Sequence, residues 1–185
     1  MERCWIVTAL GQDRPGIVAG VAQVLYRLGC NLQDSAMTRL AGEFTMMLSF
    51  SSPAKVIAAT LQDAFAPLSK RLRLAIHLTP LLSREALRPA QAGAPYMISV
   101  YGADRPGIVF RVSEALAARG VNITDVQTRR SGPAGGRRKP SLYLMVLEVE
   151  LPRRLSAASL ERTLQRIGKR LGVEVSLRSA EAELL

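Results

Sequence analysis

The feature that most constrains this chain is an internal repeat. The octapeptide GQDRPGIV at residues 11–18 returns as GADRPGIV at residues 102–109, an offset of 91 residues. The same offset continues past the motif, and 12 of the 24 positions between residues 11 and 34 are identical without a gap. Two unrelated helical segments would not agree to this extent by chance. The sequence therefore predicts two copies of one domain.

A length of 185 residues suits two units of roughly 80 to 90 residues each. We expect a first domain at residues 1–81, a linker rich in alanine and proline at 82–95, and a second domain at 96–185. Domains of this size bury little more than half of their unfolded surface. Contacts with another chain would stabilise them, so we expect a homodimer.

Each copy has the pattern β-α-β-β-α-β. The elements expected in the first copy are a strand at 5–10, a helix from residue 15 or 16 to 28, strands at 31–40 and 44–51, a helix beginning at Ser52-Pro53, and a strand at 73–81. The strand at 44–51 alternates apolar and polar residues, which is typical of one buried face. Gly29 is expected to end the first helix, because glycine readily adopts the left-handed conformation of a helix C-terminus.

The second copy follows the same plan from Tyr96 to about Ser179, with one difference. Residues 131–140 form a glycine-rich, charged insert where the first copy has a tight turn, and we interpret this insert as a mobile loop. The next strand is apolar on both faces, with Leu142 and Leu144 on one and Met145 and Leu147 on the other. Helices cover only one face of such a sheet, so we expect another surface to cover the second.

Two such units resemble tandem ACT domains over nearly the whole chain. The resemblance is carried by Asp-Arg-Pro-Gly-Ile-Val after each first strand and by Gly-x-Asn at each second strand. It implies an α+β fold of two ferredoxin-like βαββαβ units, with antiparallel sheets and helices on one face. It also implies a non-catalytic protein that binds an amino acid where two domain copies meet and regulates transcription through a partner regulator protein.

The resemblance also implies which residues bind the ligand. They are Gly11, Asp13, Pro15, Gly16 and Asn31 in the first copy, and Gly102, Asp104, Pro106, Gly107 and Asn122 in the second. A helix start offers free N–H groups to a carboxylate, an aspartate can pair with an ammonium group, and an asparagine can donate and accept. Family members often have asparagine where this chain has Asp13 and Asp104, which leaves the identity of the amino acid open.

Structural roles could account for the same residues. Asp13 could cap its own helix, and Asn31 could merely tolerate an unusual turn angle. We interpret Arg14 and Arg105 as structural or interface residues. Asp34 and Asp125 are interpreted as charges at a strand edge.

Nothing in the sequence indicates catalysis, a metal or a cofactor. The single histidine, His77, lies in an apolar strand without a second histidine for a metal site. Cys4 and Cys30 lack metal-ligand spacing, and we expect reduced thiols. The glycine-rich insert lacks the Gly-Lys-Ser/Thr ending of a phosphate loop.

The formal net charge of +10 makes direct nucleic-acid binding an alternative function. Arg162, Arg166 and Arg170 recur at a spacing of four residues on one expected helix, although the solvated face of any amphipathic helix has this spacing. Aromatic residues make up 5% and do not alternate with basic ones, which favours the partner-mediated role over direct DNA binding.

A protein-interaction module without a ligand is a further alternative. No apolar run is long enough to span a membrane, and we expect a cytoplasmic protein.

Overall fold

The computed structural model describes residues 2–81, 93–131 and 141–180. The chain divides into two compact units, Met1–Arg88 and Pro89–Leu185, each with its own sheet and hydrophobic core. Most of the expected linker and all but the first residue of the glycine-rich insert lie outside the described residues. The chain resumes in a strand that begins at Ala94, two residues before the expected start of the second domain at Tyr96.

Both units have the element order βαββαβ, which confirms the predicted fold class. The first consists of β1 (Arg3–Gln12), α1 (Ile17–Arg27), β2 (Asn31–Leu40), β3 (Glu43–Ser52), α2 (Ala58–Leu72) and β4 (Ala75–Leu81). The second consists of β5 (Ala94–Ala103), α3 (Ile108–Ala117), β6 (Asn122–Ser131), β7 (Leu142–Leu151), α4 (Ala157–Leu171) and β8 (Val173–Ser179). The strand orders are β2-β3-β1-β4 and β6-β7-β5-β8, and every pairing is antiparallel.

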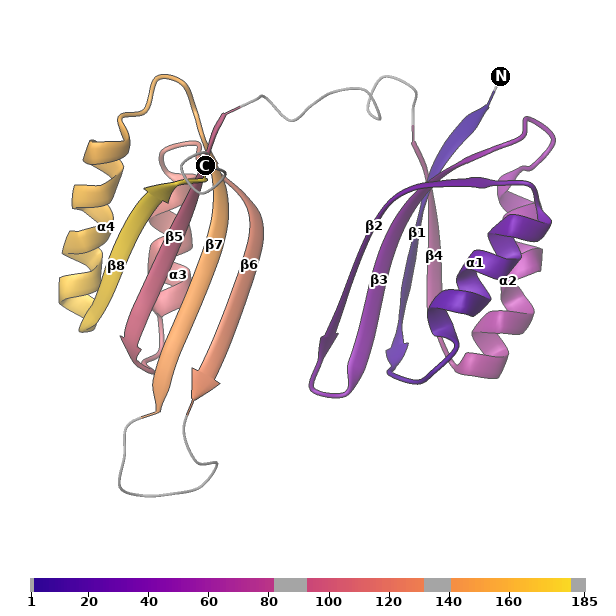
Figure 1. Ribbon diagram of the computed structural model, residues 1–185, viewed down its shortest axis with the longest axis horizontal. Helices are drawn as coiled ribbons and strands as arrows, with labels where there is room; N and C mark the ends of the chain where they lie inside the picture. Colours follow the sequence, from indigo (N-terminus) through magenta and orange to yellow (C-terminus); the bar gives the residue numbers. More distant parts are fainter. Residues whose placement is uncertain (1, 82–92, 132–140, 181–185) are drawn as a thin grey trace. The chain divides into compact units, whose positions relative to one another are not determined.

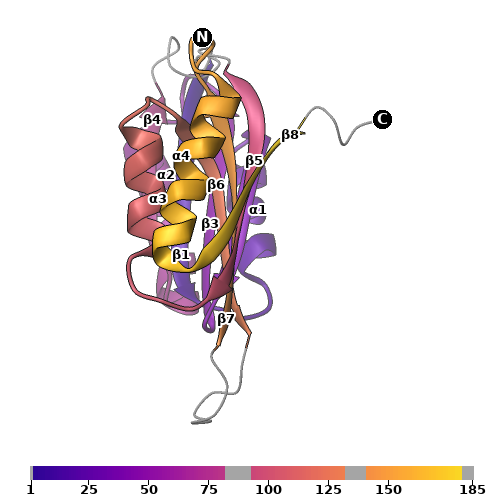
Figure 2. The ribbon, with the colours of Figure 1, turned by 90° about the vertical axis from the view of Figure 1, so that its left-hand side faces the viewer.

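In each unit the two helices cover one face of the sheet (Figure 1). Alternate residues of the central strands point into this layer, because successive side chains of a strand face opposite sides. Val7 on β1 and Phe50 on β3 are buried against α1 and α2 in this way. In the second unit α3 and α4 lie alongside each other on the sheet (Figure 2). The helix stripes predicted from the sequence therefore form the two cores.

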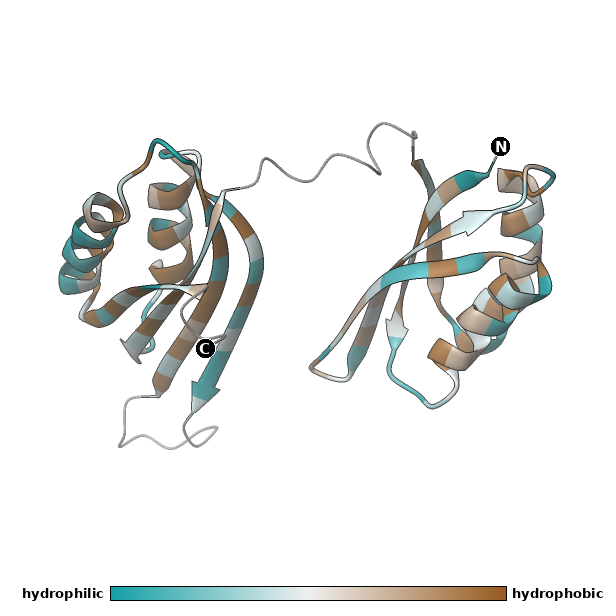
Figure 3. Cartoon of the chain, turned by 45° about the horizontal axis from the view of Figure 1, so that its top comes forward, coloured by the Kyte–Doolittle hydropathy of each residue, from teal (hydrophilic) through white to brown (hydrophobic). Residues whose placement is uncertain are grey.

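The opposite face of each sheet carries apolar side chains that the unit's own helices do not cover. Leu10 and Met47 are exposed on the first sheet, and Leu142 and Leu144 on the second. Hydrophobic and hydrophilic bands alternate along the strands accordingly (Figure 3). The expectation that another surface covers this face of β7 stays a prediction.

The predicted helix start at Ser52-Pro53 is wrong, because Ser52 is the last residue of β3. Its buried hydroxyl accepts a hydrogen bond from Trp5 Nε1 at 3.0 Å, and this bond stabilises Ser52 as part of the sheet. A turn closed by Val56 N–H and the Pro53 carbonyl follows, and α2 begins at Ala58. A distant tryptophan therefore determines the role of this serine.

The last strand of the first unit also begins later than predicted. Arg73 was expected in the strand, but it caps the C-terminus of α2 in the left-handed conformation, with φ of 53°. Gly172 occupies the corresponding position in the second unit, where glycine adopts this conformation without strain.

A second offset, of 99 residues, relates α2 and β4 to α4 and β8, and it aligns Ser69 with Gly168. A Cβ on Gly168 would lie 2.7 Å from the Val173 carbonyl oxygen, so α4 approaches β8 too closely for a side chain. At Ser69 the hydroxyl instead spans the gap and donates to the Leu74 carbonyl at 2.6 Å. The helix and strand are therefore held together differently in the two units.

We expect Gly168→Ala to destabilise the second unit by about 1 to 2 kcal/mol, because crowding of about 2 to 3 kcal/mol against the Val173 carbonyl outweighs a gain of about 1 kcal/mol in helix propensity. Urea unfolding followed by far-UV circular dichroism measures this loss. Trp5, the only tryptophan, lies in the first core, so its fluorescence midpoint should not change. Ser69→Ala is the matched control and should change stability by about 1 kcal/mol or less. Equal losses in both variants would contradict the close helix-strand contact.

Candidate functional site

The loop between the first strand and the first helix has the same geometry in both units. Gly16 and Gly107 precede the helices with φ of 94° and 93°, in the left-handed region where side chains are strained. No side chain caps either helix. The positive end of each helix dipole therefore faces the loop, an arrangement suited to a carboxylate.

An ion pair joins each loop to the end of the neighbouring edge strand. Arg39 Nη1 on β2 lies 3.1 Å from Asp13 Oδ2, and Arg130 Nη1 on β6 lies 3.4 Å from Asp104 Oδ2. The aspartate side chains are 30% and 26% exposed, whereas the arginines are mostly exposed. Each site thus presents a carboxylate and a guanidinium beside a helix N-terminus.

These contacts exclude helix capping as the role of Asp13 and Asp104. Their backbone N–H groups donate to the carbonyls of Gly42 and Ser141, the residues just before β3 and β7, while their carboxylates pair with the arginines. Arg39 and Arg130 are not among the site residues expected from the sequence. The signal was present, because the offset of 91 residues that relates the two loops also relates these two arginines.

Gly11 and Gly102 have a packing role at the base of the loop. A Cβ on Gly11 would lie 2.9 Å from the Arg73 carbonyl oxygen, and one on Gly102 would lie 2.9 Å from the Val173 Cα. Both positions need glycine because the chain that leads from the second helix into the last strand passes so close to them. The exposed Pro15 and Pro106 lie in the turn just before each helix.

Asn31 and Asn122 do not join these loops within a unit. Asn31 is paired with Ser51 at one end of the first sheet, whereas Leu40 at the other end of β2 lies opposite Glu43. Glu43 in turn pairs with Gln12, next to Asp13. Nine residues of extended strand therefore separate Asn31 from the loop end of the sheet, a distance of about 30 Å. A ligand that contacts both Asp13 and an asparagine at this position needs a second domain.

The two loops differ in their other residues. Arg14 Nη2 donates to Gln12 Oε1 at 3.0 Å, a bond that Ala103 cannot provide in the second unit. Tyr143 lies beneath the second loop, and burial, followed by the negative charge of Asp104, raises the pKa of its phenol above the ordinary value. Its hydroxyl donates to Met145 Sδ at 3.7 Å, whereas the first unit has Phe44 at the corresponding position and no hydroxyl.

The remaining candidates lie away from these loops. The backbone N–H of Asp34 donates to Ser49 Oγ, and Asp125 Oδ2 accepts from Gln127. His77 is exposed on β4 opposite Thr8.

Among the described residues no group of three or more histidine, cysteine, aspartate or glutamate side chains could hold a metal ion. No helix in the described ranges is both long and apolar enough to cross a bilayer.

Basic side chains gather on the solvent face of α4. Arg162, Arg166, Lys169 and Arg170 are exposed. Within the part of the chain that the structure describes, none of the four forms a salt bridge with a carboxylate. The face can therefore contact an anionic partner without first breaking an ion pair.

Comparison with known families identifies the two units. Residues 3–79 and residues 96–167 each match a family model described as the ACT domain, and the two matches together include most of the chain. The chain is a tandem ACT-domain protein. It belongs to the ACT-domain family, as the duplicated loop motif predicted.

Several relatives resemble this tandem ACT protein. The glycine cleavage system transcriptional repressor of Escherichia coli K12 is 28% identical over 173 residues, which cover 93% of this chain and 87% of the repressor. A UPF0237 protein of Streptococcus pneumoniae is 35% identical over 82 residues, or 44% of this chain and 93% of that protein. The crystal structure of an unknown protein from Galdieria sulphuraria matches with a TM-score of 0.82 and 27% identity, covering 97% of this chain and 99% of the other.

Proposed function

We propose that this tandem ACT protein is a non-catalytic regulator that binds an amino acid at its β1-α1 and β5-α3 loops. The observation that carries this proposal is the same constellation in both units, an uncapped helix start beside an aspartate paired with an arginine. A zwitterion has one positive and one negative group a few ångströms apart, and this constellation offers a partner for each.

The proposed contacts divide between the two charged groups of the ligand. The N-terminus of α1 and the guanidinium of Arg39 attract the α-carboxylate, while Asp13 accepts hydrogen bonds from the α-ammonium group. The helix end contributes only about 0.3 to 1 kcal/mol, whereas each charged hydrogen bond contributes about 1.5 to 3 kcal/mol. A millimolar dissociation constant corresponds to about 4 kcal/mol, so the charged contacts are needed for affinity.

A second copy of the chain would complete the site. All ten residues of the edge strand β2 are exposed, including Met37 and Leu40, and an open edge of this kind favours pairing with another strand. Antiparallel pairing of β2 with β2 of a second copy sets the beginning of one strand beside the end of the other. Asn31 of the second copy then lies near the Asp13 loop, which accounts for both parts of the predicted ligand site in a homodimer.

We further propose that ligand binding changes the population that is competent to bind a transcription regulator protein in the cytoplasm. Similarity over most of the chain to a protein named as a glycine cleavage system transcriptional repressor supports this role. Two ACT domains occupy the chain, and a partner protein would supply the contact with DNA.

The basic face of α4 supports a second candidate function, direct nucleic-acid binding. A duplex bound through Arg162, Arg166 and Arg170 would lose affinity steeply between 50 and 200 mM salt, because each neutralised phosphate releases counterions. Negligible affinity for duplex DNA at about 150 mM salt favours the partner-mediated role.

Isothermal titration of the whole protein with each of the 20 amino acids, beginning with glycine and serine, tests the ligand proposal. We expect at least one amino acid to bind with a dissociation constant in the millimolar range or below. Absence of binding by every amino acid at millimolar concentration would overturn amino-acid sensing and leave a protein-interaction module.

A further inference from the structure

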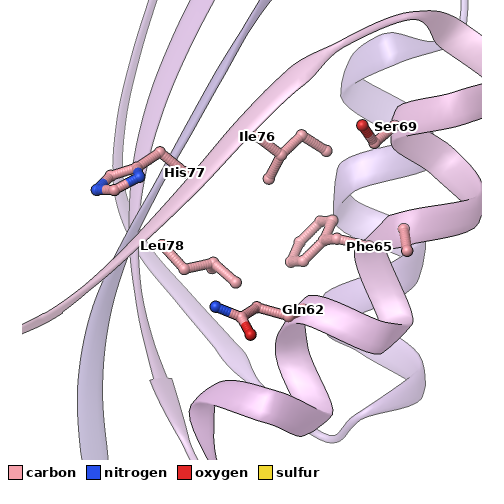
Figure 4. Close-up of a pocket in the computed structure, with 7 residues that line it drawn as sticks. Gln62, Phe65, Ser69, Ile76, His77 and Leu78 are labelled. Carbon is pink, nitrogen blue, oxygen red and sulfur yellow. The ribbon is translucent and has the colours of Figure 1, made fainter.

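The first unit contains a pocket that is separate from its β1-α1 loop. It lies between α2 and β4 and has a volume of about 260 Å³. Gln62, Phe65, Ala66 and Ser69 line it from one stripe of α2, and Ile76 and Leu78 line it from β4 (Figure 4). The side chains of Ile76 and Leu78 point towards the helix, whereas the His77 ring lies on the other side of the strand.

Comparison of the two repeats explains why α2 and β4 leave this space. At Gly168 the backbone of α4 lies directly against β8, and a Cβ would come within 2.8 Å of Val175 Cγ2. In the first unit Ser69 occupies this position and Ile76 replaces Val175. The serine Cβ and hydroxyl hold the helix end away from the strand, and the hydrogen bond to Leu74 fixes this spacing.

The lining specifies the chemistry of a ligand. Phe65, Ala66, Ile76 and Leu78 supply an apolar surface, and no aspartate, glutamate, lysine or arginine lines the pocket. The Ser69 hydroxyl already donates to Leu74, so its lone pairs remain available as acceptors. Gln62 is exposed at the rim and can donate or accept, and β4 is an edge strand whose outward backbone groups do not pair with β1.

We propose that this pocket binds a small neutral molecule with an apolar ring or branched chain and one hydrogen-bond donor. Its volume lies just below the range of about 300 to 1,000 Å³ that is typical of small-molecule sites. The ligand is therefore restricted to about the size of two fused rings. The site does not depend on amino-acid binding at the loops, because it shares none of their side chains.

Indole is a suitable probe because it is neutral, apolar and carries one N–H donor. We expect ¹H–¹⁵N spectra of the whole protein to show saturable shifts at the amides of Ser69 and of residues 76–78, with a millimolar dissociation constant. Ala66→Trp fills the pocket from an exposed helix position and should weaken indole binding at least tenfold. Ala66→Leu, a smaller change, should weaken it as well, and dispersed amide signals verify that both variants are folded.

Gln165→Trp is the matched control, since Gln165 corresponds to Ala66 on α4 and is also exposed. We expect it to bind indole as the unmodified protein does. Absence of saturable shifts at 10 mM indole, shifts confined to other residues, or unchanged binding by both Ala66 variants would each overturn the proposal.

Discussion

Replacing Phe50 with alanine is expected to destabilise the first unit by about 3 to 5 kcal/mol. Phe50 is completely buried, and it lies opposite Trp5 on the neighbouring strand with both side chains facing the helices. Truncation removes the transfer free energy of the ring and leaves a cavity that a packed core fills only in part. A domain of this size has a total stability of only about 4 to 12 kcal/mol, so this one change removes a large fraction of it.

Urea unfolding monitored through Trp5 fluorescence measures this loss in the first unit alone. Far-UV circular dichroism gives a second midpoint that does not depend on the environment of the indole ring. Tyr26→Ala is the control, because Tyr26 is 83% exposed on α1 and its removal should change stability by about 0.5 kcal/mol or less. A loss of less than about 1 kcal/mol for Phe50→Ala would contradict the described core.

Replacing Asp13 and Asp104 together with alanine is expected to lower amino-acid affinity by about 10- to 100-fold. This range corresponds to one charged hydrogen bond of about 1.5 to 3 kcal/mol at each site. The arginine of each ion pair is mostly exposed to solvent, and such a pair contributes little to stability, so the variant should fold normally. The single variants Asp13→Ala and Asp104→Ala each leave one of the two loops intact. Titration of a single variant therefore measures the affinity of its unchanged loop.

Asp63→Ala is the matched control for this prediction. It removes the same charge from an exposed position on α2, away from the loops and from β2, and the Asp63 side chain is not part of any ion pair in the described residues. We expect its affinity for the bound amino acid to equal that of the unmodified protein. Undiminished binding by the Asp13/Asp104 double variant would show that neither carboxylate contacts the ligand, and it would overturn the loop site.

The elements predicted best are those whose patterns are local and periodic. The helix beginning near Gly16 and the strand around Phe44 follow from apolar spacing, which depends on the geometry of a single element. The predictions failed at Ser52 and Arg73, where a long-range contact or a helix cap determines the conformation. Short-range rules cannot detect that Trp5 engages a serine 47 residues away.

In the candidate site, too, local sequence motifs were predictable and long-range contacts were not. The loop glycines and aspartates were recognisable because the motif repeats, but sequence alone did not distinguish a cap from an ion pair at Asp13. Arg39 became its partner because β2 ends beside the β1-α1 loop in the folded sheet. Asn31, which is closer to Asp13 in sequence than Arg39 is, lies at the far end of that strand.

The amino-acid sequence by itself determined that this protein is a duplicated βαββαβ domain, because repeated motifs and hydrophobic periodicity depend only on the order of residues. Tertiary structure decided which side chains meet. It joined Asp13 to Arg39 and separated both from Asn31. It also left a pocket beside Ser69, whereas at Gly168 the helix packs directly against the strand. These outcomes depend on how strands align and how closely a helix approaches a sheet, and such distances are fixed only when the whole unit packs.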